Sequence, residues 1–367
     1  MRAKHQLKQV LIATREQWDT ADVRPSVRQN FQKTIDCRTP LLGAEVYASA
    51  TEHRVVYHTC KSRACPSCGF RATQLWQRER WADLPDIPYA GVVLTMPDAL
   101  WPIFQRNRHL LYDLPALGAA VIQHWINARY GVRVLIMVVP HTFGRRLNFN
   151  AHLHILVSTI GLSEREGRLR KALQFDKKAL MHMWRYAVIT YLRVALEKAM
   201  LRSDLTPGQL KALLKAQYER WWNIDIAHFH SKAHFLRYAG RYVRRPPIAQ
   251  HRLIKITEQE IEFSTKDLKE KRELTTRYSV ADFVAKLAEH VPDRYRHAIR
   301  YFGLLAPRST RQAGAALFLL LGQKNRPRPR RLGWADSLYR SFGTDPLVDR
   351  RGERMHWIDR LAPTTLY

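Results

Sequence analysis

The sequence has no long hydrophobic segment. None of its apolar stretches reaches the roughly 18 residues that a membrane-spanning helix requires. The longest runs, at 134–139 and 315–321, have the length of a strand or a short core helix. The basic N-terminus also lacks the continuous apolar core and the small-residue cleavage site of a signal peptide. We therefore expect a soluble protein of the cytoplasm.

Acidic residues are scarce. The sequence contains 32 Asp and Glu against 61 Lys and Arg, and the resulting formal net charge of +29 is spread over the whole length. Such a surface attracts a polyanion, and nucleic acid is the most common one because neutralised phosphates release their counterions. An anionic membrane is the alternative. The 46% hydrophobic content is enough for sizeable cores, so we expect two or three domains.

Cysteine is also rare, but its distribution is uneven. Three of the four cysteines lie within nine residues, at Cys60, Cys65 and Cys68. The two-residue spacing of the last pair directs both sulfur atoms at one ion, which favours zinc over a disulfide framework. Basic residues around this knuckle suggest contact with DNA, although a zinc knuckle can also be purely structural. The candidates for a fourth ligand are Cys37, which is preferred, and His58 or His53.

Two histidines alternate with apolar residues over 150–157. In a strand, the two-residue period places His152 and His154 on one face while the intervening apolar side chains face the other way. Taken alone, this pattern is common in partly buried strands. A third histidine, His141, lies across an expected hairpin, so the three together could bind a divalent metal ion. His234, in a later helix, is the alternative third ligand.

Two tyrosines and four arginines lie together in a segment that is expected to be helical, 231–245. Tyr238 and Tyr242 are four residues apart, so they share one face of the helix and lie about 6 Å apart along its axis. A core-facing stripe is the usual reason for such a pair, but four arginines in nine residues are unusual in a core helix. Cleavage of a phosphodiester needs a nucleophile and positive charge, which tyrosine, a metal ion and arginine supply. The arginines expected to bind DNA are Arg237, Arg241, Arg244 and Arg245.

Hydrophobic periodicity predicts the order of the elements. The polar turn 144–148 between two apolar runs predicts an antiparallel hairpin. A basic, proline-rich run at 324–331 is expected to be extended and solvated. Helices are expected over 8–35, 72–81, 99–130, most of 164–222, 231–245 and 280–290, and strands over 54–57, 89–95, 132–139 and 151–160, followed by a meander over 251–278.

Together these motifs resemble the HUH-type two-tyrosine transposases of the insertion sequence 91 family, relatives of rolling-circle replication initiators and conjugative relaxases. The resemblance covers about 27–305 and leaves the C-terminal residues uncovered. One stretch departs from the family, whose members commonly have a further Cys-x-x-Cys knuckle between the positions of Cys37 and Cys60; here that stretch has no cysteine. The matching segments are 58–69, 93–97, 141–144, 152–154, 238–249 and 301–305.

The resemblance implies an α+β fold in which helices flank a central antiparallel sheet. In such enzymes the His-x-His pair and a third polar residue, here His141, hold Mg²⁺ or Mn²⁺. A tyrosine, Tyr238 or Tyr242, attacks the phosphate and gives a 5′-phosphotyrosine and a free 3′ hydroxyl. No ATP is needed, because the covalent link conserves the energy of the broken bond. The expected activity is rolling-circle-type transposition, with single-stranded DNA and hairpin-containing element ends as the partner.

The expected domains follow from the motifs and the resemblance. In the cell, the protein is expected in the bacterial cytoplasm, associated with the nucleoid when it is bound to DNA. The domains are a helical lead-in and zinc-binding domain over 1–85, an HUH nuclease domain over 86–250 with a helical insertion at about 164–222, a meander and helix over 251–305, and a basic extension over 306–367.

Two other functions are compatible with the motifs. A plasmid replication initiator or relaxase would share the metal and tyrosine chemistry, although the sequence has no helicase P-loop. A non-catalytic zinc-containing DNA-binding protein would keep only the scaffold. The presence of the histidine pair and of both tyrosines argues against this last alternative. Covalent capture of an oligonucleotide would distinguish such a protein from the enzymes.

Overall fold

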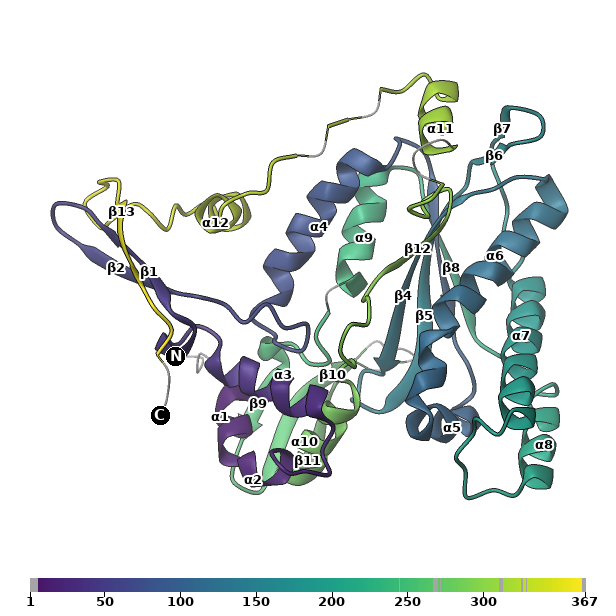
Figure 1. The fold of residues 1–367 in the computed structure, drawn as a ribbon, viewed down its shortest axis with the longest axis horizontal. Coiled ribbons are helices and arrows are strands. Elements are labelled where there is room, and N and C mark those ends of the chain that lie inside the picture. The colour runs from purple at the N-terminus through teal and green to yellow at the C-terminus, as the bar shows by residue number, and fades with distance from the viewer. Residues whose placement is uncertain are drawn as a thin grey trace.

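The molecule is elongated. The computed structural model describes residues 6–243, 245–266, 270, 272–309, 313–324, 326–327 and 329–364. A sheet with helices on both faces lies at one end, and a smaller sheet projects at the other (Figure 1). Within the described ranges, no helix combines the length and the hydrophobicity that are needed to cross a membrane.

A five-stranded antiparallel sheet forms the larger end of the molecule. Its strand order is β12-β4-β5-β3-β8. β4 and β5 form the predicted hairpin, with Ile136 paired to Val157 and His141 paired to His152. The predicted α+β class with a central antiparallel sheet is therefore confirmed. The strands are β3 (Tyr89–Leu94), β4 (Leu135–Phe143), β5 (Phe149–Ser158), β8 (Ile224–Phe229) and β12 (Arg300–Gly303).

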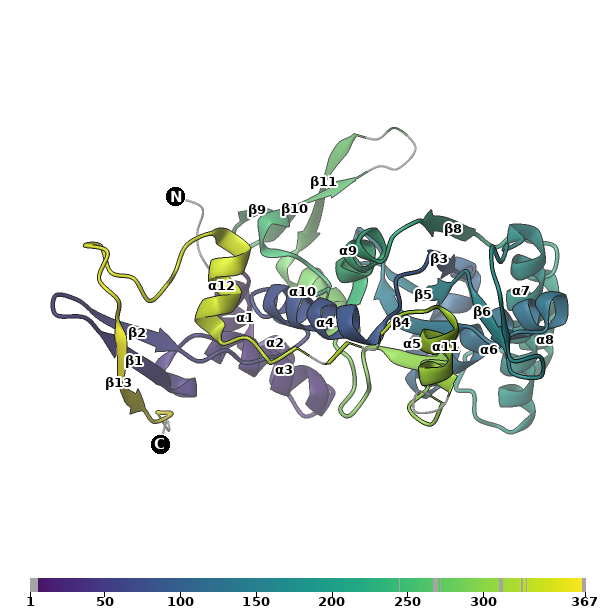
Figure 2. The ribbon, with the colours of Figure 1, turned by 90° about the horizontal axis from the view of Figure 1, so that it is seen from above.

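Helices cover both faces of this sheet, because its central strands are apolar on both sides. On one face, Val92 and Ile155 are fully buried against α6 and α7. On the other face, Leu156 packs with Trp76 of α4 and Phe235 of α9. Figure 2 shows the sheet between these two layers. The helices are α4 (Gly69–Asp83), α6 (Leu114–Tyr130), α7 (Lys177–Glu197) and α9 (Lys232–Val243).

Two segments that were expected to be mostly helical are less regular in the structure. The stretch before α6 divides into η2 (Asp98–Leu100), α5 (Trp101–Arg106) and η3 (Arg108–Tyr112). The break falls at Asn107, whose buried side-chain amide donates to the carbonyl oxygens of Ile103 and Arg202. The insertion at 164–222 begins in the turn of a hairpin, where Gly167 adopts φ 62°. The hairpin joins β6 (Gly161–Ser163), just before the insertion, to β7 (Arg168–Arg170), and α7 and α8 (Pro207–Ala216) follow.

A second core joins the N-terminal helices to the predicted meander. Trp18 and Phe31 are in edge contact, with ring centroids 5.5 Å apart, and share this core with Phe263 and Phe283. Segments more than 200 residues apart in the sequence therefore form one body. Its elements are α1 (Gln6–Ala13), α2 (Arg15–Trp18), α3 (Pro25–Asp36), η4 (Gln250–Arg252), β9 (Leu253–Ile256), β10 (Glu260–Lys266), β11 (Glu273–Ser279) and α10 (Val280–Glu289).

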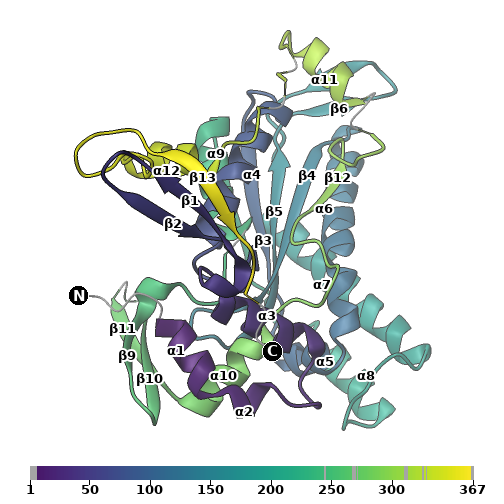
Figure 3. The ribbon, with the colours of Figure 1, turned by 60° about the vertical axis from the view of Figure 1, so that its left-hand side comes forward.

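The smaller sheet contains a strand from the C-terminal segment. β13 (His356–Leu361) pairs with β1 (Ala44–Ala48), which pairs with β2 (His53–Tyr57), so that Leu361 lies opposite Ala44 (Figure 3). The described residues of the basic run 324–331 form no helix or strand, as expected. The predicted domain boundaries stay a prediction. This pairing and the second core both join segments that were assigned to different domains. The remaining elements are η1 (Pro40–Leu42), α11 (Ala315–Leu320) and α12 (Trp334–Phe342).

Candidate active site and zinc site

Three histidines meet on the α9 side of the central sheet. His141 comes from β4, and His152 and His154 come from β5. Their positions follow from the hairpin register, which pairs His141 with His152 and Val139 with His154. One ring nitrogen of each histidine lies within 4.8 Å of those of the other two. His234, the alternative third ligand, is exposed on α9 and is not part of this group.

Backbone carbonyls orient two of the three imidazoles. Nε2 of His141 lies 2.9 Å from the carbonyl oxygen of Tyr242, and Nδ1 of His152 lies 2.8 Å from that of Asn150. A carbonyl oxygen only accepts, so each of these nitrogens is the N–H donor and the other ring nitrogen keeps its lone pair. Metal-binding histidines are typically oriented by such a bond on the far side of the ring.

The spacing of the ring nitrogens also suits a metal ion. Nε2 of His152 and Nε2 of His154 are 3.1 Å apart. Two nitrogen ligands bound to one ion at about 2.1 Å are roughly 3.0–3.4 Å apart in octahedral or tetrahedral geometry. Among the described residues, neither Nδ1 of His154 nor Oδ1 of Asn150 has a hydrogen-bond partner, although both atoms are buried. The His154 ring is therefore not committed to a hydrogen bond on its Nδ1 side.

Burial keeps the three imidazoles neutral. Desolvation is the main cause that lowers the pKa of His141 and His152 below the ordinary value. It lowers the pKa of His154 to about 2, and the nearby His152 and Arg245 contribute to the same direction. Neutral imidazole is the form that binds metals. The group is thus in its metal-binding state over the whole physiological range of pH.

α9 brings both tyrosines to this group. The Tyr242 ring stacks on the His154 ring with centroids 3.8 Å apart, and the Tyr238 ring lies one helical turn earlier, 5.0 Å from that of Tyr242. Gly91 in β3 makes room for this arrangement, because a Cβ at that position would lie 2.8 Å from Cε1 of Tyr238. The structure thus places Tyr242 against the histidine group and Tyr238 next to it.

The two tyrosines differ in their surroundings. Burial, followed by the charge and the hydrogen bond of Tyr242, raises the pKa of Tyr238 well above its usual range. The Arg241 guanidinium lies 5.3 Å from the centroid of the Tyr238 ring. Arg237 and Arg245 are exposed before and after the tyrosines. Arg244 lies outside the described residues.

A cavity of about 400 Å³ opens beside His141. His141 and Arg245 line it together with Arg63, which comes from the loop between Cys60 and Cys65. The proximity of Arg63 and of Asn150 to the histidines was not foreseen from the sequence. For Asn150 the period of the strand that carries His152 would have indicated it, whereas no local pattern brings Arg63 to β4.

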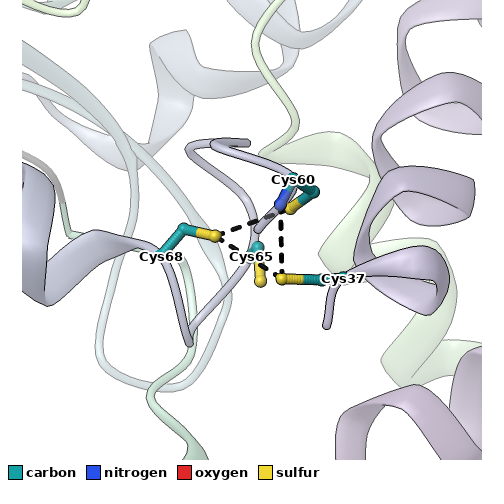
Figure 4. Close-up of side chains that lie close together, drawn as sticks. All are labelled: Cys37, Cys60, Cys65 and Cys68. Carbon is teal, nitrogen blue, oxygen red and sulfur yellow. Dashed lines mark hydrogen bonds between the residues drawn. The ribbon is translucent and has the colours of Figure 1, made fainter. Parts of the chain in front are cut away.

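The four cysteines converge at the start of α4. Sγ of Cys68 is 3.6 Å from Sγ of Cys37 and 3.6 Å from Sγ of Cys60, and Cys65 completes the group (Figure 4). Four sulfur ligands at about 2.3 Å from a tetrahedral zinc ion are roughly 3.8 Å apart, whereas a disulfide bond is about 2.05 Å long. The spacing therefore fits zinc thiolate ligation.

Charge and competing contacts agree with this ligand set. Hydrogen bonds within the group hold the pKa of Cys37 well below its usual range and raise the pKa of Cys60, while the bonds to Cys37 and Cys68, together with burial, raise the pKa of Cys65. Cys37 is therefore the first of these three to become a thiolate, the form that binds zinc. His58 is engaged elsewhere, with Nδ1 2.9 Å from the carbonyl oxygen of Leu42 and Nε2 3.0 Å from Glu45. His53 is exposed in β2, so Cys37 is the candidate that the structure brings to the other three cysteines.

Known proteins with similar sequences are transposases. The family described as "Putative transposase" matches residues 136–313, and the family described as "Transposase zinc-binding domain" matches residues 7–96. The transposase for insertion sequence element IS801 of Pseudomonas savastanoi pv. phaseolicola is 33% identical over 294 residues, which cover 76% of this chain and 70% of that protein. The "Putative transposase y4qJ" of Sinorhizobium fredii is 29% identical over 305 residues, 78% of this chain and 76% of that protein. No solved structure is significantly similar to the chain.

Proposed function

The chain belongs to the transposase family of insertion sequences 91 and 801, and on this premise we propose that it nicks and rejoins single-stranded DNA through a 5′-phosphotyrosine intermediate. The observation that supports this chemistry most directly is the stacking of the Tyr242 ring on His154, inside a group of three neutral histidines. A nucleophile and a metal-binding set thereby share one site.

His141, His152 and His154 would hold Mg²⁺ or Mn²⁺ at this site. The ion, when bound, supplies positive charge that polarises the scissile phosphate and stabilises the leaving 3′ oxygen. The protein contributes the orientation of the imidazoles through the carbonyl groups of Tyr242 and Asn150. Because one of these carbonyls belongs to Tyr242, the same helix fixes both the metal-binding group and the nucleophile.

Tyr242 is the tyrosine that we assign to the first cleavage. As its phenolic oxygen forms a bond to phosphorus, the phenolic proton passes to solvent and the bond between phosphorus and the 3′ oxygen breaks. Arg245, three residues further on, would hold a neighbouring phosphate. Tyr238 lies one turn away, with its ring 5.0 Å from that of Tyr242, and is assigned to the second strand transfer.

The zinc-binding domain has a different role. Cys37, Cys60, Cys65 and Cys68 would supply four sulfur ligands, which leaves no open position on a tetrahedral ion. Such a closed site stabilises structure and does not activate a substrate. Hairpin-containing ends of the element are the proposed DNA partner, and the large positive charge of the chain fits this assignment.

Cleavage of labelled single-stranded DNA tests the proposal. The substrate carries one end of the encoding element with its flank and is incubated with and without Mg²⁺ or Mn²⁺. We expect metal-dependent cleavage by the wild type and by His234→Ala, a control on the exposed face of α9. His152→Ala and His154→Ala should lose cleavage while they still bind the DNA. Cleavage without metal, or unchanged cleavage by these two variants, would reject the assignment.

A further inference from the structure

The zinc knuckle and the histidine group are neighbours in space. We propose that the knuckle forms one wall of the nuclease site and that Arg63, held between two zinc ligands, binds a phosphate of the single-stranded DNA next to the scissile one. This inference rests on the proposed function, since it assigns a further substrate contact to the same site. It gives the zinc-binding domain a direct part in positioning the substrate.

The placement of Arg63 carries the argument. Arg63 lines the same cavity of about 400 Å³ as His141 of β4 and Arg245, which follows α9. Its positive charge is one of the causes that lower the pKa of His141, which agrees with a close approach of the guanidinium to that ring. Three segments far apart in the sequence therefore face one space, and one of them is the cysteine loop.

The loop that carries Arg63 is fixed on both sides. The buried hydroxyl of Ser62 donates to Oδ1 of Asn30 in α3 over 2.6 Å and accepts from the backbone N–H of Ala64 over 3.1 Å. Ala64 itself is buried in the second core. With Cys60 and Cys65 at its two ends, the loop has little freedom. Because its backbone is fixed, Arg63 loses less conformational entropy when it binds a phosphate than an arginine on a free loop would.

The charge of the cavity favours a phosphate. Its two acidic residues are already engaged: Asp293 interacts with Arg24 and Tyr112, and Asp113 accepts a 2.9 Å hydrogen bond from Tyr191. Guanidinium groups bind phosphate oxygens in a bidentate manner. The volume is at the lower end of the range of ligand pockets, so it suits about one nucleotide. The arginines that line the cavity are Arg63, Arg108, Arg245, Arg296 and Arg300.

A binding measurement tests this inference separately from cleavage. The probe is the labelled single-stranded oligonucleotide described above, titrated by fluorescence anisotropy without added divalent metal at several salt concentrations. Arg63→Ala should weaken binding roughly tenfold to a hundredfold, which is the usual effect of losing one charge-assisted hydrogen bond pair. The slope of log Kd against log salt should fall by about 0.7, as expected for one lost phosphate contact on a single strand.

Lys61→Ala is the matched control, because Lys61 lies in the same loop but is exposed and does not line the cavity. It should change the affinity much less than Arg63→Ala. Zinc content is measured for both variants. If Arg63→Ala has lost zinc, Arg63→Gln, which keeps most of the side chain, takes its place in the comparison. Binding by the zinc-loaded variant that equals the binding by Lys61→Ala would overturn the inference.

A chemically modified probe locates the contact. Methylphosphonates, which are neutral, replace one phosphate at a time around the cleaved bond. We expect one position next to that bond at which neutralisation weakens binding by the wild type but not by Arg63→Ala. If neutralisation weakens binding by the wild type and by Arg63→Ala to the same degree at every position, a direct contact is contradicted. If the wild type does not cleave the DNA but Arg63→Ala still weakens binding, the proposed function fails and the phosphate contact stands.

Discussion

At the scale of single residues, the candidate active site depends on histidines that are kept neutral by burial. His154 has a pKa of about 2, and the pKa values of His141 and His152 are also lowered. All three would therefore offer lone pairs to a metal ion at neutral pH without competing protons. The cost is that the folded protein cannot bind the protons that the unfolded chain accepts.

We therefore predict that the protein becomes less stable as the pH is lowered. In the unfolded chain His154 binds a proton below its ordinary pKa of 6.5, while in the folded protein it stays neutral down to about pH 2. The free energy of unfolding should therefore decrease by about 1.4 kcal/mol per pH unit for this one group as pH falls below 6.5. Melting temperatures of the wild type and of His154→Asn, recorded from pH 8 to pH 4 without added divalent metal, give the difference. Parallel pH profiles for the two proteins would show that His154 is not held neutral.

The nature of the ligands also predicts a preference among metals. Mg²⁺ favours oxygen ligands, whereas imidazole favours transition metals. Because all three residues of the group are histidines, Mn²⁺ should support cleavage at a lower concentration than Mg²⁺. Titration of each ion against the rate of cleavage measures this. A lower half-saturating concentration for Mg²⁺ would indicate that oxygen ligands, from residues outside this group or from the DNA, dominate the site.

Several of these residues could be identified from the sequence, and others could not. His152, His154, Tyr238 and Tyr242 stand in local patterns whose period is set by strand and helix geometry, so their side chains were expected to share a face. No local spacing relates Arg63 to His141. Their proximity depends on how the cysteine loop, α3 and β4 are arranged in three dimensions, which no local spacing encodes.

At the scale of elements, a glycine in β3 allows α9 to pack closely against that strand. A Cβ at Gly91 would lie 2.8 Å from Tyr238 and 3.3 Å from Phe229. Both contacts are with aromatic side chains that pack in a confined space, so the Tyr238 ring would have to move. The position of one catalytic candidate thus depends on the absence of a side chain in the neighbouring strand.

We therefore expect Gly91→Ala to impair the step assigned to Tyr238 more than the first cleavage. Gly208→Ala, at the start of α8, is the control because the nearest atom to a Cβ there is 4.0 Å away. Rates of single-stranded cleavage and of strand rejoining, measured separately, should show a selective loss of rejoining in Gly91→Ala. An equal loss of both activities would mean that the substitution acts on α9 as a whole.

The elements that the sequence predicted best are those with a continuous apolar run or a regular helical period. β3, β4, β5 and α9 are buried on at least one face, and their periodicity is clear. β1, β8, β12 and β13 were not predicted. They are partly exposed, and each pairs with a strand that is distant in sequence; β13 pairs with β1 from the other end of the chain. Pairing with a distant strand stabilises such segments more than their own composition does.

At the scale of the whole molecule, two hydrophobic clusters are linked by the cysteine site. α3, which ends at Asp36 just before Cys37, belongs to the second core, while α4, which begins after Cys68, packs on α9 with Gln77 donating to the carbonyl oxygen of Leu236 over 2.8 Å. A zinc ion held by both segments would therefore connect the N-terminal core to the helix that carries the tyrosines. This long-range connection could not be read from the spacing of the cysteines.

Loss of zinc should consequently loosen the N-terminal part of the molecule first. We expect Cys65→Ser to lose stoichiometric zinc and to show an additional unfolding transition at lower temperature, because small metal sites contribute folding free energy directly. Ser67→Ala, in the same knuckle but outside the cysteine group, should keep both zinc and the wild-type melting profile. Elemental analysis and calorimetry measure the two effects. A wild-type protein without stoichiometric zinc would contradict the assignment.

The proposed chemistry requires a covalent bond between the protein and the DNA. The most direct measurement is to trap this adduct with a single-stranded oligonucleotide from an element end, separate it on a denaturing gel and map the modified residue by mass spectrometry. We predict a metal-dependent adduct on Tyr242, loss of the first cleavage in Tyr242→Phe and no adduct in the variant that lacks both Tyr238 and Tyr242. Tyr186→Phe, an exposed tyrosine of α7, should behave as the wild type. An adduct mapped to Tyr186 or Tyr191, or no adduct under conditions in which the DNA is cleaved, would contradict the mechanism.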